Sequence, residues 1–244
     1  MRSNTYVLLF TALVTVILGF LLSVTYSQLK ELQEENVAVD MRKNILRSLD
    51  IREEEGEIWT NETVQYLYET FIRTTILDSD GRDVSDVTIE MVDAEVDTTY
   101  FPLFTKVVNG DIEGYAIPVI GRGLWSTLYG YLALEPDGIT VKGIQFYKHK
   151  ETPGLGGEVE KDWFTGNFIG KRVTDEEGQL VSIQVLRGKV DPGSSEAYHQ
   201  VDGISGATVT SKGVTNFLMD DLKKYEPFFQ KIRKDTAEEI VWRY

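Results

Sequence analysis

The segment Asp202–Ser211, DGISGATVTS, gathers hydroxyl side chains around positions with little bulk. Three of these positions leave room for a ligand to approach the backbone: Gly203, Gly206 and Ala207. Thr210 or Ser211 can cap a helix that we expect to begin near Lys212. A group on this turn would then face the positive end of the helix dipole, which suits a phosphate. The same residues also fit an ordinary capped turn without a ligand.

Two further glycine-rich segments precede it, Gly121–Ser126 (GRGLWS) and Lys148–Glu158 (KHKETPGLGGE). In the first, the glycines let the backbone approach a flat or anionic ligand. Trp125 there is either a stacking surface or a plug of the core. In the second, Pro153–Gly157 is too rich in glycine and proline for regular structure, and its amides can form a nest for an anion. We expect His149 to be a solvated loop residue.

Composition excludes several kinds of chemistry. The absence of cysteine excludes disulfides, thiol catalysis and cysteine-bound metals, and two histidines are too few for a histidine-rich metal site. No phosphate-binding lysine of a P-loop is present, and no base flanks Thr208 to make it a nucleophile. No serine–histidine spacing or carboxylate pair indicates a hydrolase. The net charge of −14 argues against nucleic acid as a partner. We therefore expect no catalytic residue and no metal ligand.

An apolar segment near the N-terminus predicts a membrane-spanning helix. No formally charged side chain occurs from Ser3 to Leu29, and a helix over 5–26 would be about 33 Å long, enough to cross a bilayer. A cleaved signal peptide is the alternative, but its apolar core is typically shorter. Arg2 precedes the segment, whereas Lys30 and a group of glutamates follow it. The positive-inside tendency then places the N-terminus in the cytoplasm and the large domain on the extracytoplasmic side.

Residues 30–57 are expected to form a helical stalk. Asp40 can cap a helix in it whose apolar side chains share one face: Met41, Ile45, Leu46 and Leu49. We expect the anchor to comprise residues 1–29 and the remaining domain to comprise residues 58–244.

Alternating patterns predict an α+β fold for this domain, with a mostly antiparallel sheet flanked by helices. Expected strands are Val84–Val92, Leu128–Glu135, Ile139–Tyr147 and Gln179–Leu186. The second and third form a hairpin, with a bulge at Gly143. Thr63–Ile76 fits either a helix or a strand. Near the end, four apolar residues at helical spacing predict an amphipathic helix against the sheet: Val214, Phe217, Leu218 and Leu222.

The three glycine-rich segments together resemble the FMN-binding domain family. DGISGATVTS resembles its flavinylation motif, an aspartate, two residues, Ser or Thr, then Gly-Ala-Thr. GRGLWS and HKETPGLGGE resemble conserved blocks of the C subunits of sodium-translocating NADH:quinone reductases. The related G subunits of the Rnf complex share the ETPGLG-like block but not GRGLWS.

The resemblance implies that Thr208 carries FMN through a phosphoester, attached by a separate flavin transferase. It implies Trp125 and Leu155 as an apolar wall for the flavin ring. The remaining implied cofactor-binding residues lie in the same three segments: Ser126, Thr152, Gly154, Asp202, Ser205, Gly206 and Ala207.

The resemblance further implies an electron-carrying subunit of a bacterial inner-membrane reductase coupled to sodium export. FMN would pass single electrons between other subunits of the complex, and the protein would orient the flavin and tune its potential. Two alternatives stay open: a G-type flavoprotein of the Rnf complex, and a non-redox exported module whose glycine loops hold an anion that dissociates.

Overall fold

The computed structural model describes residues 3–54 and 57–241, without the side chains of Glu90 and residues 235–241. It divides into two units, residues 1–41 and 42–244. The first unit consists of most of helix α1 (Asn4–Ser48), which is long and apolar enough to cross a membrane. Its apolar side chains from Tyr6 to Val24 are exposed.

Helix α1 continues without a break through the segment expected to hold a second helix start. Asp40 lies inside α1, so the expected cap at Asp40 is wrong. The reason is local: residues 28–41 are mostly good helix formers and include neither glycine nor proline, so nothing ends the helix. The expected apolar face is confirmed, because Ile45, Leu46 and Leu49 are fully buried.

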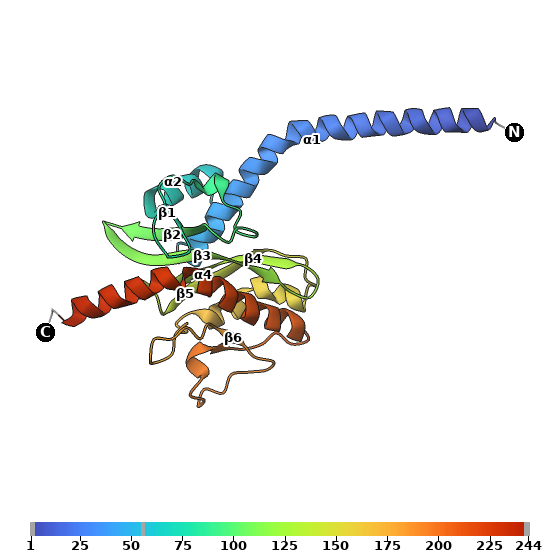
Figure 1. The fold of residues 1–244 in the computed structure, drawn as a ribbon. Helices are drawn as coiled ribbons and strands as arrows, with labels where there is room; N and C mark the ends of the chain where they lie inside the picture. Colours follow the sequence, from blue (N-terminus) through green and yellow to red (C-terminus); the bar gives the residue numbers. More distant parts are fainter. Residues whose placement is uncertain (1–2, 55–56, 242–244) are drawn as a thin grey trace. The chain divides into compact units, whose positions relative to one another are not determined.

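The second unit is built on a five-stranded antiparallel sheet (Figure 1). Its strands follow chain order from edge to edge: β1 (Ile72–Leu77), β2 (Phe101–Val108), β3 (Asp111–Arg122), β4 (Thr127–Leu134) and β5 (Val141–Lys148). The expected hairpin is confirmed as β4 and β5. Its bulge is also present, because Leu134 pairs with Val141 and Ala133 with Gly143, which leaves Lys142 as the extra residue.

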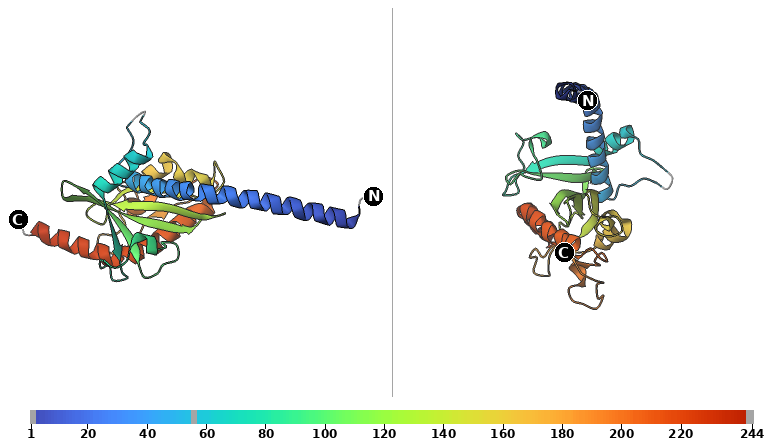
Figure 2. Two further views of the ribbon diagram at one scale, coloured as in Figure 1. Left: turned by 90° about the horizontal axis from the view of Figure 1, so that it is seen from above. Right: turned by 90° about the vertical axis from the view of Figure 1, so that its right-hand side faces the viewer.

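Helices cover both faces of this sheet (Figures 1 and 2). Helix α4 (Thr208–Val241) packs on one face, where the expected apolar stripe at Val214, Phe217, Leu218 and Leu222 is buried. The last turns of α1 lie on the other face: a Cβ on Gly143 would be 2.6 Å from the Ser48 carbonyl oxygen. Helix α2 (Asn61–Phe71) leads directly into β1.

The structure shows which parts of residues 60–110 form helix and which form strand. Thr63–Ile76 is both, since α2 ends at Phe71 and β1 begins at the next residue. The expected strand Val84–Val92 is wrong: the only regular element that the described residues form there is a short 3-10 turn, η1 (Ile89–Met91). Strand β2 carried no recognised signal in the sequence.

Short elements connect β5 to α4: η2 (Gly156–Glu160), α3 (Asp162–Thr165), η3 (Gly166–Phe168), β6 (Gln184–Val185), η4 (Ala197–His199) and β7 (Gln200–Val201). The expected strand Gln179–Leu186 is therefore mostly wrong: Leu180 forms an isolated bridge with Thr174, and only Gln184–Val185 form a strand, in parallel with β7. Ser182 has φ 61°, outside the strand region, and the N–H groups of Val181 and Ser182 both donate to the Val173 carbonyl.

Candidate functional site

A single buried carboxylate, that of Glu151, joins the three glycine-rich segments. Its Oε1 accepts hydrogen bonds from the N–H groups of Trp125 (2.9 Å) and Ser126 (3.1 Å). Its Oε2 accepts from the Leu124 N–H (3.3 Å) and from the Thr210 hydroxyl (2.8 Å). Glu151 itself is 5% exposed. Burial acts to raise the pKa of the Glu151 carboxyl, but these four hydrogen bonds outweigh it and lower the pKa below its usual value.

The GRGLWS segment forms an anion nest, but the anion that it binds is a side chain of the protein itself, the Glu151 carboxylate. Three consecutive main-chain N–H groups converge on the Glu151 carboxylate, as in the backbone nests that bind external anions. The N–H groups of Leu124, Trp125 and Ser126 are therefore already bonded within the chain. Gly123 and Gly156 make room for the carboxylate, since a Cβ on either would lie 2.7 or 2.6 Å from one of its oxygens.

The ETPGLG segment is held to its neighbours on both sides. The Lys150 N–H donates to the Ser126 hydroxyl oxygen at 2.7 Å, which ties the segment to GRGLWS. Leu155 lies against the third segment, because a Cβ on Gly206 would be 2.7 Å from Leu155 Cδ2. Inside the segment, the Thr152 carbonyl accepts from the N–H groups of Leu155 and Gly157.

His149 has a structural position in this loop. Its Nδ1 accepts a hydrogen bond from the Glu151 N–H (3.2 Å), and its Nε2 lies 3.2 Å from a carboxylate oxygen of Glu160. Its side chain is 11% exposed, so the expected solvated histidine is instead mostly buried.

The last long helix begins at Thr208, four residues earlier than expected. Thr210 and Ser211 do not cap it: Thr210 binds Glu151, and the Ser211 hydroxyl accepts from the Ile204 N–H at 3.4 Å. Thr208 is exposed at the first helical position. As in any α-helix, the N–H groups of this first turn have no carbonyl partner within the helix. The hydroxyl of Thr208 therefore lies closer to the positive helix end than the sequence predicted.

Asp202 and Gly203 shape the entry to this turn. Asp202 Oδ1 accepts from the Val190 N–H at 2.8 Å and so fixes the preceding loop. A Cβ on Gly203 would overlap the Leu186 carbonyl oxygen, which explains why only glycine fits there.

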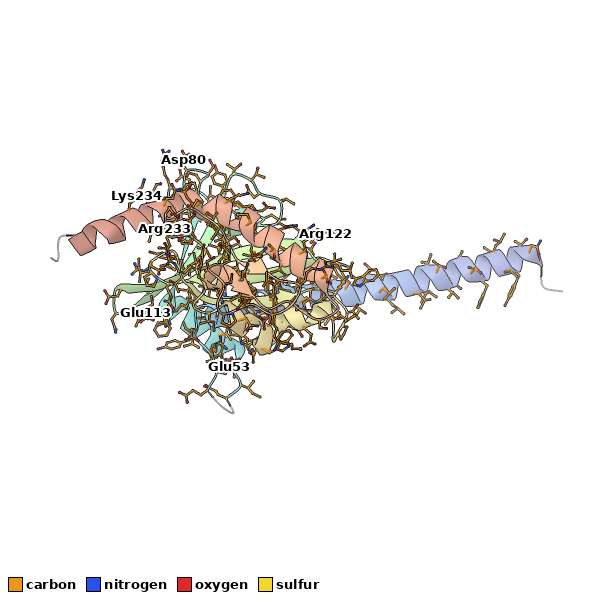
Figure 3. The ribbon with its side chains drawn as sticks, turned by 90° about the horizontal axis from the view of Figure 1, so that it is seen from below. Glu53, Asp80, Glu113, Arg122, Arg233 and Lys234 are labelled. Carbon is orange, nitrogen blue, oxygen red and sulfur yellow. The ribbon has the colours of Figure 1, made fainter. Side chains whose placement is uncertain are left out.

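The surface around Thr208 is apolar as well as polar. Trp125 is 68% exposed and Leu155 is 42% exposed, so Trp125 is not a core plug. Other predicted site residues are also exposed: Thr152, Gly154, Ser205 and Gly206. Figure 3 shows Arg122, just before this loop, beside the end of α4 at which the helix begins. An exposed hydroxyl, a free helix start and exposed apolar side chains fit a ligand with a phosphate and a flat ring.

The sequence analysis gives no role to Glu151 and only a capping role to Thr210, although the bond between these two side chains organises the site. The available signal was a lone acidic residue between a strand end and a glycine-rich loop, which resembles ordinary charged surface. A separate cavity of about 270 Å³, lined by residues that include Ser182, His199 and Met219, contains none of the predicted site residues.

The part of the chain that holds this site is similar in sequence to known proteins. Residues 123–223 match the model of the FMN-binding domain, a range that includes Thr208. Over 140 residues, 57% of this chain, the sequence is 46% identical to the C subunit of the Na(+)-translocating NADH-quinone reductase of Pseudomonas aeruginosa. Over 132 residues it is 41% identical to that of Yersinia pestis. These matches span about half the length of each relative, 53% and 48%.

Solved structures extend the similarity to most of the chain. The crystal structure of the Na(+)-translocating NADH-quinone reductase C subunit from Parabacteroides distasonis superposes with a TM-score of 0.70 at 32% identity. That match covers 82% of this chain and 96% of the relative. The structure from Shewanella oneidensis, at 24% identity and a TM-score of 0.68, shows the same fold. The chain belongs to the family of Na(+)-translocating NADH-quinone reductase C subunits, and its residues 123–223 match the FMN-binding domain.

Proposed function

We propose that this chain is the electron-carrying flavoprotein subunit of a membrane NADH:quinone reductase that exports sodium, and that a phosphoester joins FMN to Thr208. The observation that carries this proposal is the position of Thr208, exposed at the first residue of α4 within a complete Asp-x-x-Ser-Gly-Ala-Thr motif. The match to the FMN-binding domain supports the cofactor, and the named relatives support the complex.

The chain's own groups suit a tethered flavin. A phosphodiester on Thr208 would carry one negative charge beside the unpaired amides of the first helical turn, which favours an anion there. Trp125 and Leu155 would provide the apolar wall for the ring, with Ser126, Thr152 and Gly154 near its edge. The bound FMN would supply one-electron chemistry, and the protein would hold it in one orientation.

The proposal includes partners and a location. Other subunits of the reductase would deliver and accept the electrons, and a flavin transferase would form the bond to Thr208. Helix α1 would anchor the chain in the bacterial inner membrane as a single span, with the FMN-binding domain on the extracytoplasmic side.

The proposal is tested by flavin fluorescence on a denaturing gel after co-expression with the flavin transferase. We expect a fluorescent band for the wild-type chain and for Thr98→Val, and none for Thr208→Val. Thr98→Val is the control, because it makes the same change at an exposed threonine outside the three segments. A fluorescent band in Thr208→Val would contradict the attachment site. A wild-type protein that never binds flavin would favour the non-redox module.

The electron donor separates the proposed reductase from the Rnf alternative. We expect membranes that contain the assembled complex to reduce quinone with NADH. Activity that requires ferredoxin instead would identify the G-type subunit.

A further inference from the structure

The four hydrogen bonds of Glu151 connect segments that are far apart in the chain. Its partners lie 25–27 residues earlier, in GRGLWS, and 59 residues later, on α4. Each connected segment carries one element of the proposed flavin site: Trp125 on the first, Leu155 on the second and Thr208 on the third. Glu151 touches none of these three side chains in its hydrogen bonds, so its role is to place the backbones that carry them.

The carboxylate is suited to this role because it is an anion surrounded by donors. Among the described residues, no ion pair is formed with Glu151, and its charge is balanced by main-chain N–H groups and one hydroxyl. Three consecutive N–H groups that converge on one spot form a concavity that favours an anion. Without the carboxylate, the Gly123–Ser126 turn would keep its bond from the Gly123 N–H to the Ser126 carbonyl (2.8 Å), but the N–H groups of Leu124–Ser126 would lose their acceptor.

We propose that Glu151 is the positioning residue of the flavin site, whose buried carboxylate holds the three segments together so that the flavin-binding surface exists before the flavin arrives. The identity of the ligand in this proposal rests on the proposed function. The positioning role itself does not, because every hydrogen bond involved joins two residues of this chain.

Asp221 provides a matched control, because it is a second buried carboxylate and lies on α4, where it bonds to the neighbouring strand β3. It is 4% exposed, accepts a hydrogen bond from the Ile120 N–H at 2.7 Å and pairs with Lys224 at 2.7 Å. It fastens α4 to Ile120, near the end of β3, and contacts none of the three segments through these bonds. A purely structural role for Glu151 predicts that Glu151→Gln and Asp221→Asn behave alike.

The test is hydrogen–deuterium exchange on the full chain, produced without flavin transferase so that no flavin is attached. In Glu151→Gln, one of the two carboxylate oxygens becomes an NH₂ donor and cannot accept the N–H groups that it faced. We expect the amides of Leu124–Ser126 to exchange at least tenfold faster, with the β3–β4 ladder unchanged. In Asp221→Asn we expect no selective change at Leu124–Ser126. Unchanged exchange in Glu151→Gln, or an equal rise at all amides, would overturn the proposal.

A second variant keeps the proposal testable if Glu151→Gln does not fold. Thr210→Val removes the hydroxyl donor and leaves the carboxylate with its three main-chain donors. We expect faster exchange at the start of α4, at the Ser211 N–H that bonds to the Ala207 carbonyl, and a smaller rise at Leu124–Ser126. Protection equal to wild type at both places would contradict the positioning role.

The flavin-loaded protein gives an independent readout. With Thr208 intact, we expect Glu151→Gln to shift the absorbance and circular-dichroism bands of the bound flavin, and Asp221→Asn to leave them unchanged. If the wild-type chain carries no flavin at all, the proposed function fails while the exchange result still decides the role of Glu151. Identical flavin spectra in wild type and Glu151→Gln would count against the proposal.

Discussion

Gly213, in the second turn of α4, lies so close to Arg122 that a Cβ atom on Gly213 would overlap the Arg122 carbonyl oxygen. The loop that carries Trp125 starts at this point of contact. Alanine normally favours a helix interior over glycine by about 1 kcal/mol. Here we expect Gly213→Ala to lower the free energy of unfolding by about 1–3 kcal/mol, because the helix must move away from rigid backbone.

Urea denaturation checks this, with Gly188→Ala as the control. A Cβ on Gly188 would have no neighbour within 4 Å, so its effect should be small. A stabilising effect of Gly213→Ala would show that α4 and the β3 end are not in this contact.

The second prediction concerns Gly206, which combines a positive φ of 75° with the contact to Leu155. An alanine in this conformation is strained by about 1–2 kcal/mol. Gly178 has a similar φ of 78° but open space around it, so Gly178→Ala measures the backbone strain alone. We expect both variants to be destabilised in urea, and only Gly206→Ala to change the spectrum of the bound flavin. The role of the Leu155 contact would be refuted by identical spectra in the two variants.

The third prediction concerns Trp125, whose side chain is 68% exposed. Because so little of it is buried, Trp125→Ala should change the free energy of unfolding by no more than about 0.5 kcal/mol. We expect the flavin label on Thr208 to remain and its absorbance spectrum to shift, because the ring loses its aromatic neighbour. Tyr66→Ala, on α2 and 67% exposed, is the matched aromatic control. An unchanged spectrum in Trp125→Ala would mean that Trp125 does not contact the flavin.

The fourth prediction is a pH dependence that arises at Glu53. Burial acts to raise the pKa of Glu53, but bonds from Arg47 and Lys43 outweigh it and lower the pKa from 4.5 to about 2. These cations lie 2.6 and 2.9 Å from the carboxylate. The unfolded chain therefore takes up the proton at higher pH than the folded chain, so the stabilisation is complete above about pH 4.5 and is lost towards pH 2.

We therefore expect the stability difference between wild type and Glu53→Gln to shrink steadily as the pH is lowered through this window. Denaturation curves at several pH values measure it. A difference that stays constant from pH 6 to pH 2.5 would exclude Glu53 as the titrating group.

The parts of the fold that the sequence predicted are those with a periodic apolar pattern. The β4–β5 hairpin and the stripe on α4 bury one face each, so alternation or helical spacing marks them directly. The strand expected at Gln179–Leu186 shows the same alternation, yet Ser182 turns the chain out of the strand conformation after Val181. Burial does not alternate along this segment, because the polar Ser182 is buried next to Ile183.

For a related reason, some residues of the site could be predicted from the sequence and others could not. The glycines and hydroxyls of the three segments identified where a ligand could bind, and Thr208 followed from a complete motif. Glu151 was not recognised because its importance comes from partners up to 59 residues away, which one sequence does not pair. The sequence predicts the start of α4 too late because Thr210 and Ser211 fit a capping pattern, whereas Thr210 bonds to Glu151 and Ser211 to Ile204.

The most direct test of the central claim is the intact mass of the full chain, extracted from cells that also produce the flavin transferase. We predict the mass of the polypeptide plus one FMN less one water, with the addition mapped by fragmentation to Thr208. A chain with the mass of the unmodified polypeptide, or with the flavin on any other residue, would contradict the account.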